Sequence, residues 1–164
     1  MVNGGRIAQG TARMDTDRLF RLDGQTALIT GSSRGIGFAL ARGLAGAGAS
    51  IVLNGRGLDC LGEAAAELRE EGAKVEELAF DVTDHAAARE AVDRYESEIG
   101  PIDVLVNNAG MQHRAPLEDF PAEAFERLMN TNLASVFHVG QAVARHMIGR
   151  GRGKIVNICS VPVS

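Results

Sequence analysis

Thr30-Gly31-Ser32-Ser33-Arg34-Gly35-Ile36-Gly37 is the stretch that decides the fold. The apolar run at 26–29 precedes it and is short enough for a buried parallel strand. After it, apolar residues recur at helical spacing up to Gly48, which suits a helix stop: Ile36, Leu40, Leu44 and Ala47. A strand, a glycine-rich turn and a helix in this order are the context in which such a turn binds a dinucleotide.

The backbone of this turn explains the expected chemistry. Glycines permit a tight bend and the close approach of a pyrophosphate, and the free N–H groups of the helix start attract its negative charge. The residues expected to contact the cofactor here are Gly31, Ser33, Arg34, Gly35, Ile36 and Gly37. Glycines also make caps and bends, and the spacing G-x-x-x-G-x-G differs from the commoner G-x-G-x-x-G. A Walker-type phosphate loop is excluded because no Lys-Ser or Lys-Thr follows the glycines.

The length and composition predict one globular domain. The chain has 164 residues, of which 45% are hydrophobic, so it is long and apolar enough to bury a core. Residues 22–164 are expected to form the dinucleotide-binding domain, and residues 1–21 a flexible N-terminal extension without the apolar core of a secretory signal. Met14 is an alternative start to Met1.

Charge and cysteine content exclude several classes of protein. The net charge of −4 argues against general nucleic-acid affinity, and no apolar run is long enough to cross a bilayer. Cys60 and Cys159 are too few and too scattered for a disulfide framework or a zinc site, which favours a reducing cytoplasm. We expect no metal, because the histidines lack ligand spacing with acids or cysteines.

Short apolar runs alternate with helical patterns along the whole chain. Further strands are expected at 50–54, 75–80, 102–106 and 155–159, with helices between them and a long helix from Pro121 to Met147. This alternation predicts an α/β fold, a Rossmann-type doubly wound parallel sheet with about five strands. Ligands of such sheets bind at the carboxyl ends of the strands.

Unusual polar residues follow these strands and bear on the choice of cofactor. An NAD site usually has an acid after the second strand, to accept hydrogen bonds from the ribose. This chain has Asn54-Gly55-Arg56 there, and Arg34 in the glycine turn. Two guanidinium groups suit a 2′-phosphate, so Asn54, Arg34 and Arg56 are expected at an NADP site, with NAD the less favoured cofactor. The alternative is that both arginines are solvated surface residues.

With these residues in view, the sequence resembles the short-chain dehydrogenase/reductase family from about Leu22 to Ser160. The glycine turn matches the family's T-G-x-x-x-G-x-G, and Asn107-Asn108-Ala109-Gly110 matches its N-N-A-G. The resemblance implies that Asp81 and Val82 contact adenine and that Asn108, Ala109 and Gly110 line the cofactor. It implies two catalytic residues, Asn132 holding a water of the proton relay and Ser160 binding the substrate oxygen. Without the family, Asn132 would be an ordinary helical residue and Ser160 a turn residue.

The chain departs from the family at its acid/base. The family uses a tyrosine in Tyr-x-x-x-Lys beyond the serine, whereas the one tyrosine here is Tyr95 and the lysines are Lys74 and Lys154. The last strands of the family fold are also missing from the sequence. We therefore expect a domain that is incomplete at its C-terminus and 164 residues that are inactive and poorly soluble alone.

The substrate is indicated by the segment 110–117. It is similar to that of the family's gluconate 5-dehydrogenase branch, and Arg114 is expected to pair with a sugar-acid carboxylate, or otherwise to be a surface arginine. The resemblance thus implies an NADP-dependent oxidoreductase acting on gluconate and its 5-keto form. It also implies a homo-oligomer, dimer or tetramer, with Val136, Val143 and Met147 of the long helix in the subunit interface. Two alternatives are a 3-oxoacyl-carrier-protein reductase and a non-catalytic nucleotide-binding fragment.

Overall fold

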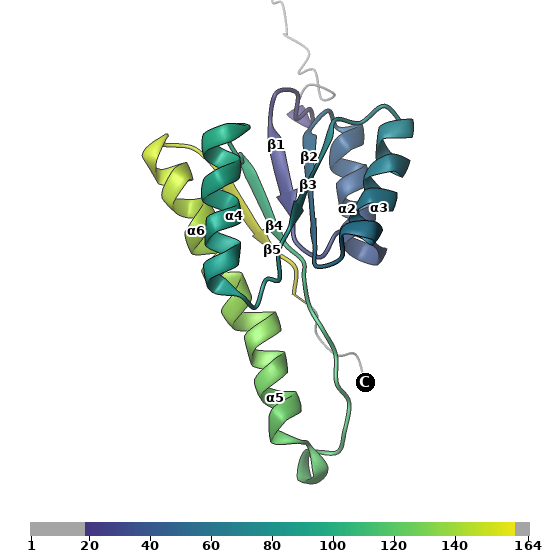
Figure 1. The fold of residues 1–164 in the computed structure, drawn as a ribbon, viewed down its shortest axis with the longest axis vertical. Helices are drawn as coiled ribbons and strands as arrows, with labels where there is room; N and C mark the ends of the chain where they lie inside the picture. The colour runs from purple at the N-terminus through teal and green to yellow at the C-terminus, as the bar shows by residue number, and fades with distance from the viewer. Residues whose placement is uncertain (1–18, 160–164) are drawn as a thin grey trace, which may run out of the picture.

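The computed structural model describes residues 19–159, in which a parallel sheet lies between two layers of helices (Figure 1). The strands are β1 (Thr26–Ile29), β2 (Ser50–Gly55), β3 (Val75–Ala79), β4 (Val104–Asn107) and β5 (Lys154–Asn157). The helices are α2 (Gly35–Gly46), α3 (Leu58–Glu70), α4 (His85–Glu98), α5 (Ala122–Met129) and α6 (Ser135–Gly149). The strand order is β3-β2-β1-β4-β5 and every pairing is parallel, so the doubly wound α/β fold is confirmed.

β1 has the expected bounds, and those of the other strands differ from the expected ones by one or two residues. β4 begins at Val104 because the N–H and C=O groups of Ile102 bind side chains, of Glu96 and Arg150, instead of a neighbouring strand. β5 begins at Lys154, and its last ladder bond is donated by the N–H of Ile158 to Asn107 O at 2.9 Å. Local apolar runs therefore located the strands, and backbone partners decided where each one begins and ends.

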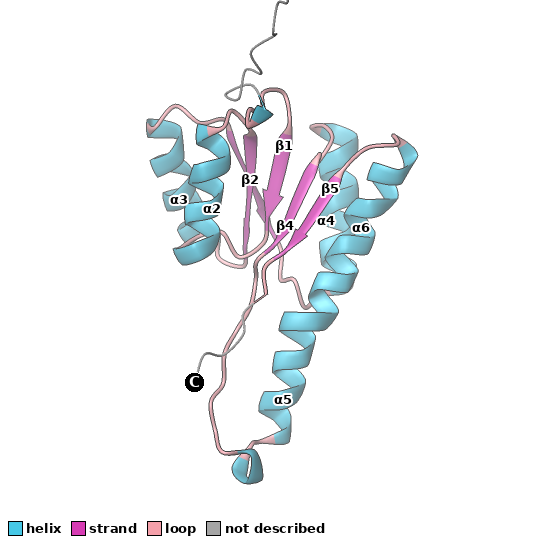
Figure 2. Cartoon of the chain, turned by 180° about the vertical axis from the view of Figure 1, so that it is seen from behind, coloured by secondary structure: helices cyan, strands magenta, loops and turns pink. Residues whose placement is uncertain are grey.

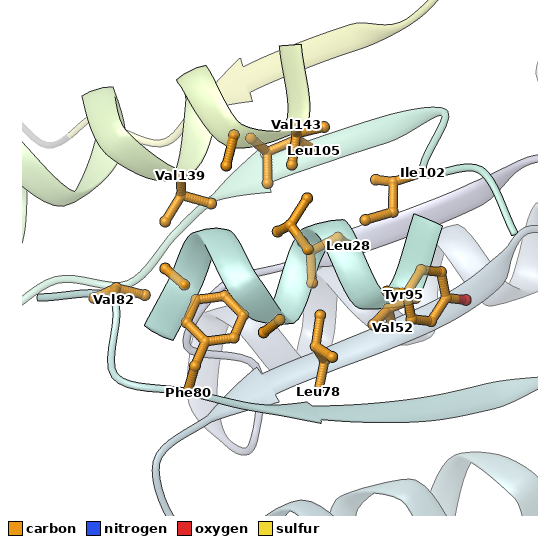
Figure 3. Packing of buried hydrophobic residues seen from close by; sticks show 14 of the residues in the cluster. Leu28, Val52, Leu78, Phe80, Val82, Tyr95, Ile102, Leu105, Val139 and Val143 are labelled. Carbon is orange, nitrogen blue, oxygen red and sulfur yellow. The ribbon is translucent and has the colours of Figure 1, made fainter. Parts of the chain in front are cut away.

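Alternate residues of each strand face opposite helix layers. One layer is formed by α4 and α6, which cover a cluster that includes Leu28, Val52 and Leu105 (Figure 3). Helices α2 and α3 cover the other face, where Ile29 and Leu53 are fully buried (Figure 2). Burying each such side chain contributes about 1.5–3 kcal/mol, so the two clusters hold the sheet and its helices in register.

The long helix after Pro121 is interrupted, and part of its expected role is wrong. A π-helical turn, Asn130–Ala134, separates α5 from α6. Val143 and Met147 are 0% and 6% exposed and pack in the cluster shared with α4, so they belong to the core of this chain and not to a subunit interface. The large apolar side chains that this helix exposes are Phe125, Met129, Leu133, Phe137 and Ile148.

The sheet has two different edges within the described residues. β3 carries Glu76 and Glu77 on one edge, whereas β5 on the other edge exposes Ile155 and Val156 by 41% and 46%. The edge formed by β5 is therefore apolar, and such an edge favours pairing with another strand. Between residues 19 and 159, no helix is long and apolar enough to span a membrane.

Candidate functional site

The carboxyl ends of β1, β2 and β4 meet at the glycine turn. Thr30 and Ser32 are buried, 2% and 0% exposed, and their hydroxyls bind the backbone of neighbouring strands. The Thr30 Oγ1 accepts from the N–H groups of Asn108 and Ala109 at 2.9 and 3.0 Å, and the Ser32 Oγ donates to Ile29 O at 2.7 Å. Sequence reasoning did not assign a role to either residue, although two hydroxyl side chains at a spacing of two directly after a strand are a usable signal.

Steric limits explain two of the glycines in this turn. Gly31 has a φ of +63° and its Cα faces Ala109 so closely that a Cβ would lie 2.9 Å from Ala109 Cα. A Cβ on Gly37 would lie 2.5 Å from Asn108 Nδ2 and closer still to Gly31 O. Only glycine lets the turn after β1 and the turn after β4 approach to this distance.

The opposite side of the turn is open. Arg34 and Ile36 are exposed, and a Cβ on Gly35 would meet nothing within 4 Å. The first turn of α2 has no side-chain cap and no acidic residue, whereas Asp84 caps α4 by accepting from Ala87 N at 3.0 Å. The helix start at Gly35 therefore presents uncapped N–H groups in an open space, which is the geometry that binds a phosphate.

The two predicted asparagines of this site bind backbone groups. Asn54 is 1% exposed and its Nδ2 donates to Leu78 O and Phe80 O at 3.0 and 3.1 Å, so the structure leaves no amide hydrogen of Asn54 for a direct ligand contact. The Nδ2 of Asn108 donates to Thr30 O and Gly31 O at 3.0 and 3.2 Å. Both side-chain amides therefore stabilise the glycine turn and its surroundings through hydrogen bonds to backbone carbonyls. Ala109 is partly buried beside them, and Gly110 is exposed.

Arg56 and Asp81 lie together at the ends of β2 and β3. The Arg56 Nη1 is 3.8 Å from Asp81 Oδ2, and the arginine side chain is 81% exposed. Partial burial opposes ionisation of Asp81, but hydrogen bonds from Thr83 and the charge of Arg56 outweigh it and lower the pKa of this carboxyl. Asp81 is therefore an anion at neutral pH. The side chain of Val82 is 7% exposed and packs in the core.

Asn132 and the segment after β4 form the third part of the site. Asn132 lies in the π-helical turn, where its Oδ1 accepts from Met111 N and its Nδ2 donates to Met111 O, both at 2.9 Å. This pair ties the segment that carries His113 and Arg114 to the long helix. The His113 ring packs edge-on against Phe120 at 5.2 Å, and Arg114 is exposed without an ion pair among the described residues.

Two further predictions are the catalytic role of Ser160 and the lack of metal ligation by the histidines. Ser160 lies outside the described residues. At the ends of β4 and β5, the Asn107 Nδ2 donates to Asn157 Oδ1 at 2.9 Å. The rings of His85 and His138 stack at 3.5 Å between α4 and α6. From residue 19 to residue 159, no three His, Cys, Asp or Glu side chains are grouped so that they could hold a metal ion.

Tyr95 is a core residue and does not reach the site. It is 5% exposed on α4, and burial, reinforced by Glu76 and Glu96, raises its pKa to about 12. Because the folded state disfavours the phenolate, burial of the neutral Tyr95 contributes to stability without loss below the ordinary tyrosine pKa of about 10. This contribution is lost as the pH rises toward 12.

This arrangement gives a spectroscopic prediction. The chain contains one tyrosine and no tryptophan, so the absorbance of a phenolate reports Tyr95 alone. We expect no phenolate signal below about pH 11 in the folded protein and a midpoint of about pH 10 after unfolding in urea. A folded-state midpoint equal to the unfolded one would contradict the buried position.

The comparisons with known proteins agree with this geometry. The family model described as short chain dehydrogenase matches residues 25–163. The chain is 57% identical over 143 residues to gluconate 5-dehydrogenase of Gluconobacter oxydans and 46% identical over 143 residues to 5-keto-D-gluconate 5-reductase of Escherichia coli. In each case the match covers 87% of this chain and 56% of the relative, so the chain spans little more than half the length of these two curated relatives.

A solved structure extends the likeness to three dimensions. A gluconate 5-dehydrogenase from Burkholderia cenocepacia, crystallised with NADP and tartrate, superposes with a TM-score of 0.86 at 55% identity, covering 88% of this chain and 57% of that one. The family match, the glycine turn and the parallel sheet are thus found in the same residues. The chain belongs to the short-chain dehydrogenase family.

Proposed function

We propose that this chain binds NADP at the glycine turn and that its protein transfers a hydride between NADP(H) and a sugar acid, interconverting gluconate and 5-ketogluconate. The observation that carries the proposal is the uncapped start of α2 at Gly35, open to solvent and flanked by the exposed Arg34. When bound, the nicotinamide supplies the hydride donor or acceptor. The residues of this chain then bind the cofactor and the substrate and orient them.

The second phosphate of NADP is assigned to the two arginines. Arg56 is largely exposed, and the position before it is Gly55, where a Cβ would lie 3.5 Å from Ser33 Oγ. Ser33, Arg34 and Arg56 thus offer a hydroxyl and two guanidinium groups to the 2′-phosphate. Directly after β2, where an NAD site usually has an acid that binds the ribose, this chain has no carboxylate that would repel this phosphate. The relative crystallised with NADP supports the same choice.

Arg114 is the proposed contact for the substrate carboxylate. It is exposed on the segment that the Asn132–Met111 pair fastens at the carboxyl edge of the sheet. A guanidinium without an ion pair there suits a sugar acid, the substrate type in the names of both curated relatives. Ser160 is proposed to bind the substrate oxygen, and Asn132 to position the segment and the relay water.

We also propose a cytoplasmic homo-oligomer, a dimer or tetramer. The exposed apolar side chains of α5 and the π-helical turn, among them Phe125 and Leu133 at 56% and 60%, support a subunit contact on this surface. The thiols of Cys60 and Cys159 are both free and exposed, which suits a reducing compartment.

The cofactor assignment is tested by binding to the 164-residue chain. Arg56→Ala is expected to weaken NADPH binding about ten- to a hundredfold, because a charge-assisted contact to the phosphate is removed, and to change NADH binding little. Arg94→Ala, which removes an exposed arginine of α4, is the matched control and is expected to bind both cofactors like the wild type. Fluorescence titration of NADPH and NADH measures both dissociation constants for the wild type and for each variant. Equal losses for NADPH and NADH with Arg56→Ala would contradict the assignment.

A further inference from the structure

All the polar groups of Asn54 are used inside the protein. Its N–H donates to Ser32 Oγ at 3.0 Å, and its C=O accepts from Ser32 N at 2.9 Å. Its Oδ1 accepts from Gly31 N at 3.3 Å, and its Nδ2 donates to the carbonyls of Leu78 and Phe80. With 1% of its surface exposed, this residue is a connector between segments and has no face toward a ligand.

The segments that Asn54 connects are the two halves of the proposed cofactor site. Gly31 and Ser32 belong to the glycine turn that would hold the pyrophosphate. Leu78 lies in β3, and Phe80 follows the end of this strand and directly precedes Asp81, which lies beside Arg56. One side chain at the end of β2 therefore fixes the position of the β1 turn relative to the β3 end.

The connection requires an amide in particular. The oxygen of Asn54 meets a donor, Gly31 N–H, while its nitrogen meets two acceptors, Leu78 O and Phe80 O. A carboxylate of the same shape still accepts from the Gly31 N–H, but it places negative charge against the carbonyl oxygens of Leu78 and Phe80. Only its protonated form regains a donor, because the O–H group then reaches one of the carbonyls.

We propose that Asn54 is a positioning residue for NADP, which holds the phosphate-binding turn and the β3 end at the separation that one bound cofactor spans. This inference rests on the proposed function. It replaces the expected direct contact of Asn54 with the cofactor by a role that acts through Gly31 and Phe80.

Asn54→Asp separates positioning from general damage by its pH dependence. At about pH 8 we expect NADPH affinity at least about tenfold below that of the wild type at the same pH. At about pH 5.5 the protonated carboxyl restores a donor, and the deficit should shrink severalfold. Asn130→Asp, an exposed asparagine of the π-helical turn, adds the same charge and is expected to follow the wild type at both pH values. A deficit that does not change with pH, or an affinity within twofold of the wild type at about pH 8, would overturn the proposal.

A second variant and a ligand-free measurement complete the test. Asn54→Ser keeps one donor without a charge, so it should fold even if Asn54→Asp does not. Its NADPH affinity should be several-fold below that of the wild type, by the same factor at both pH values. An NADPH affinity equal to that of the wild type overturns the proposal. Hydrogen exchange without ligand should be faster in Asn54→Asp at residues 30–33 and 78–83 only. If the wild type binds no NADPH, the proposed function fails, and the exchange pattern alone decides whether Asn54 joins these two segments.

Discussion

Gly37→Ala is expected to abolish detectable NADPH binding and to destabilise the fold. The new Cβ would lie 2.5 Å from Asn108 Nδ2, 2.9 Å from Ser32 Cα and nearer still to Gly31 O. Two of these neighbours are backbone atoms, so the glycine turn itself has to move, and with it the N–H groups at the start of α2. Overpacking of this kind costs about 1–3 kcal/mol, against a gain of about 1 kcal/mol in helix propensity.

Gly43→Ala is the matched control for this prediction. It lies in the same helix, is exposed and has nothing within 4 Å of its ideal Cβ. We expect it to stabilise the protein by about 0.5–1 kcal/mol and to leave NADPH binding unchanged. Urea unfolding followed by circular dichroism and NADPH titration measure both variants. A Gly37→Ala protein that binds NADPH like Gly43→Ala would show that the close approach of the two turns is unnecessary.

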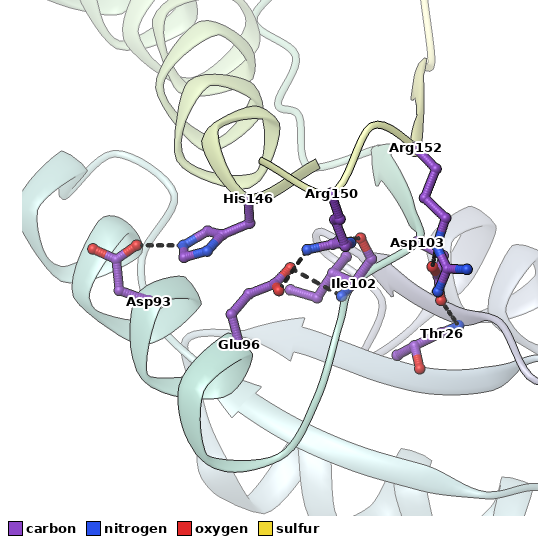
Figure 4. Close-up of polar contacts among 8 residues, drawn as sticks. All are labelled: Thr26, Asp93, Glu96, Ile102, Asp103, His146, Arg150 and Arg152. Carbon is purple, nitrogen blue, oxygen red and sulfur yellow. Dashed lines mark hydrogen bonds and ion pairs between the residues drawn. The ribbon is translucent and has the colours of Figure 1, made fainter. Parts of the chain in front are cut away.

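Glu96→Ala is expected to destabilise the protein more than Gly37→Ala does. Glu96 and Arg150 are 6% and 22% exposed and form an ion pair of 2.7 Å between the ends of α4 and α6 (Figure 4). The Glu96 Oε1 also accepts from Ile102 N at 3.0 Å, and the Arg150 Nη2 donates to Ile102 O at 2.5 Å. Removing the carboxylate leaves a partly buried guanidinium and a buried N–H unpaired, which costs about 3–5 kcal/mol.

Thermal unfolding tests this prediction. The midpoint should fall by about 10 °C for Glu96→Ala, whereas Glu98→Ala, an exposed acid two residues further along α4, should change it by less than about 2 °C. The double variant Glu96→Ala/Arg150→Ala should lose less than the sum of the single losses, because no charge is then left unpaired. Additive losses would mean that the two side chains act independently.

Most of the fold could be predicted from local patterns. The strand cores at 26–29 and 50–54 and the helix after Gly35 follow from apolar periodicity and the glycine turn, and the structure confirms them. The apolar pattern predicted burial less well in the long helix, because the apolar residues from Met129 to Met147 lie on two faces of it. The π-helical turn at Asn130–Ala134 interrupts the helical period, so Met129 and Leu133 are exposed while Val143 and Met147, in α6, are buried.

The amino-acid sequence by itself determined the family, the parallel α/β fold and the residue types at the carboxyl edge of the sheet, because these depend on spacing along the chain. Only the tertiary structure decided what each of those residues touches. Asn54 meets Gly31 and Phe80 because β2 lies between β1 and β3, and Glu96 meets Arg150, 54 residues away, because α4 packs on α6. The type of each side chain is given by the sequence, but its partners are set by the order of the strands and the packing of the helices, which involve residues distant in the sequence.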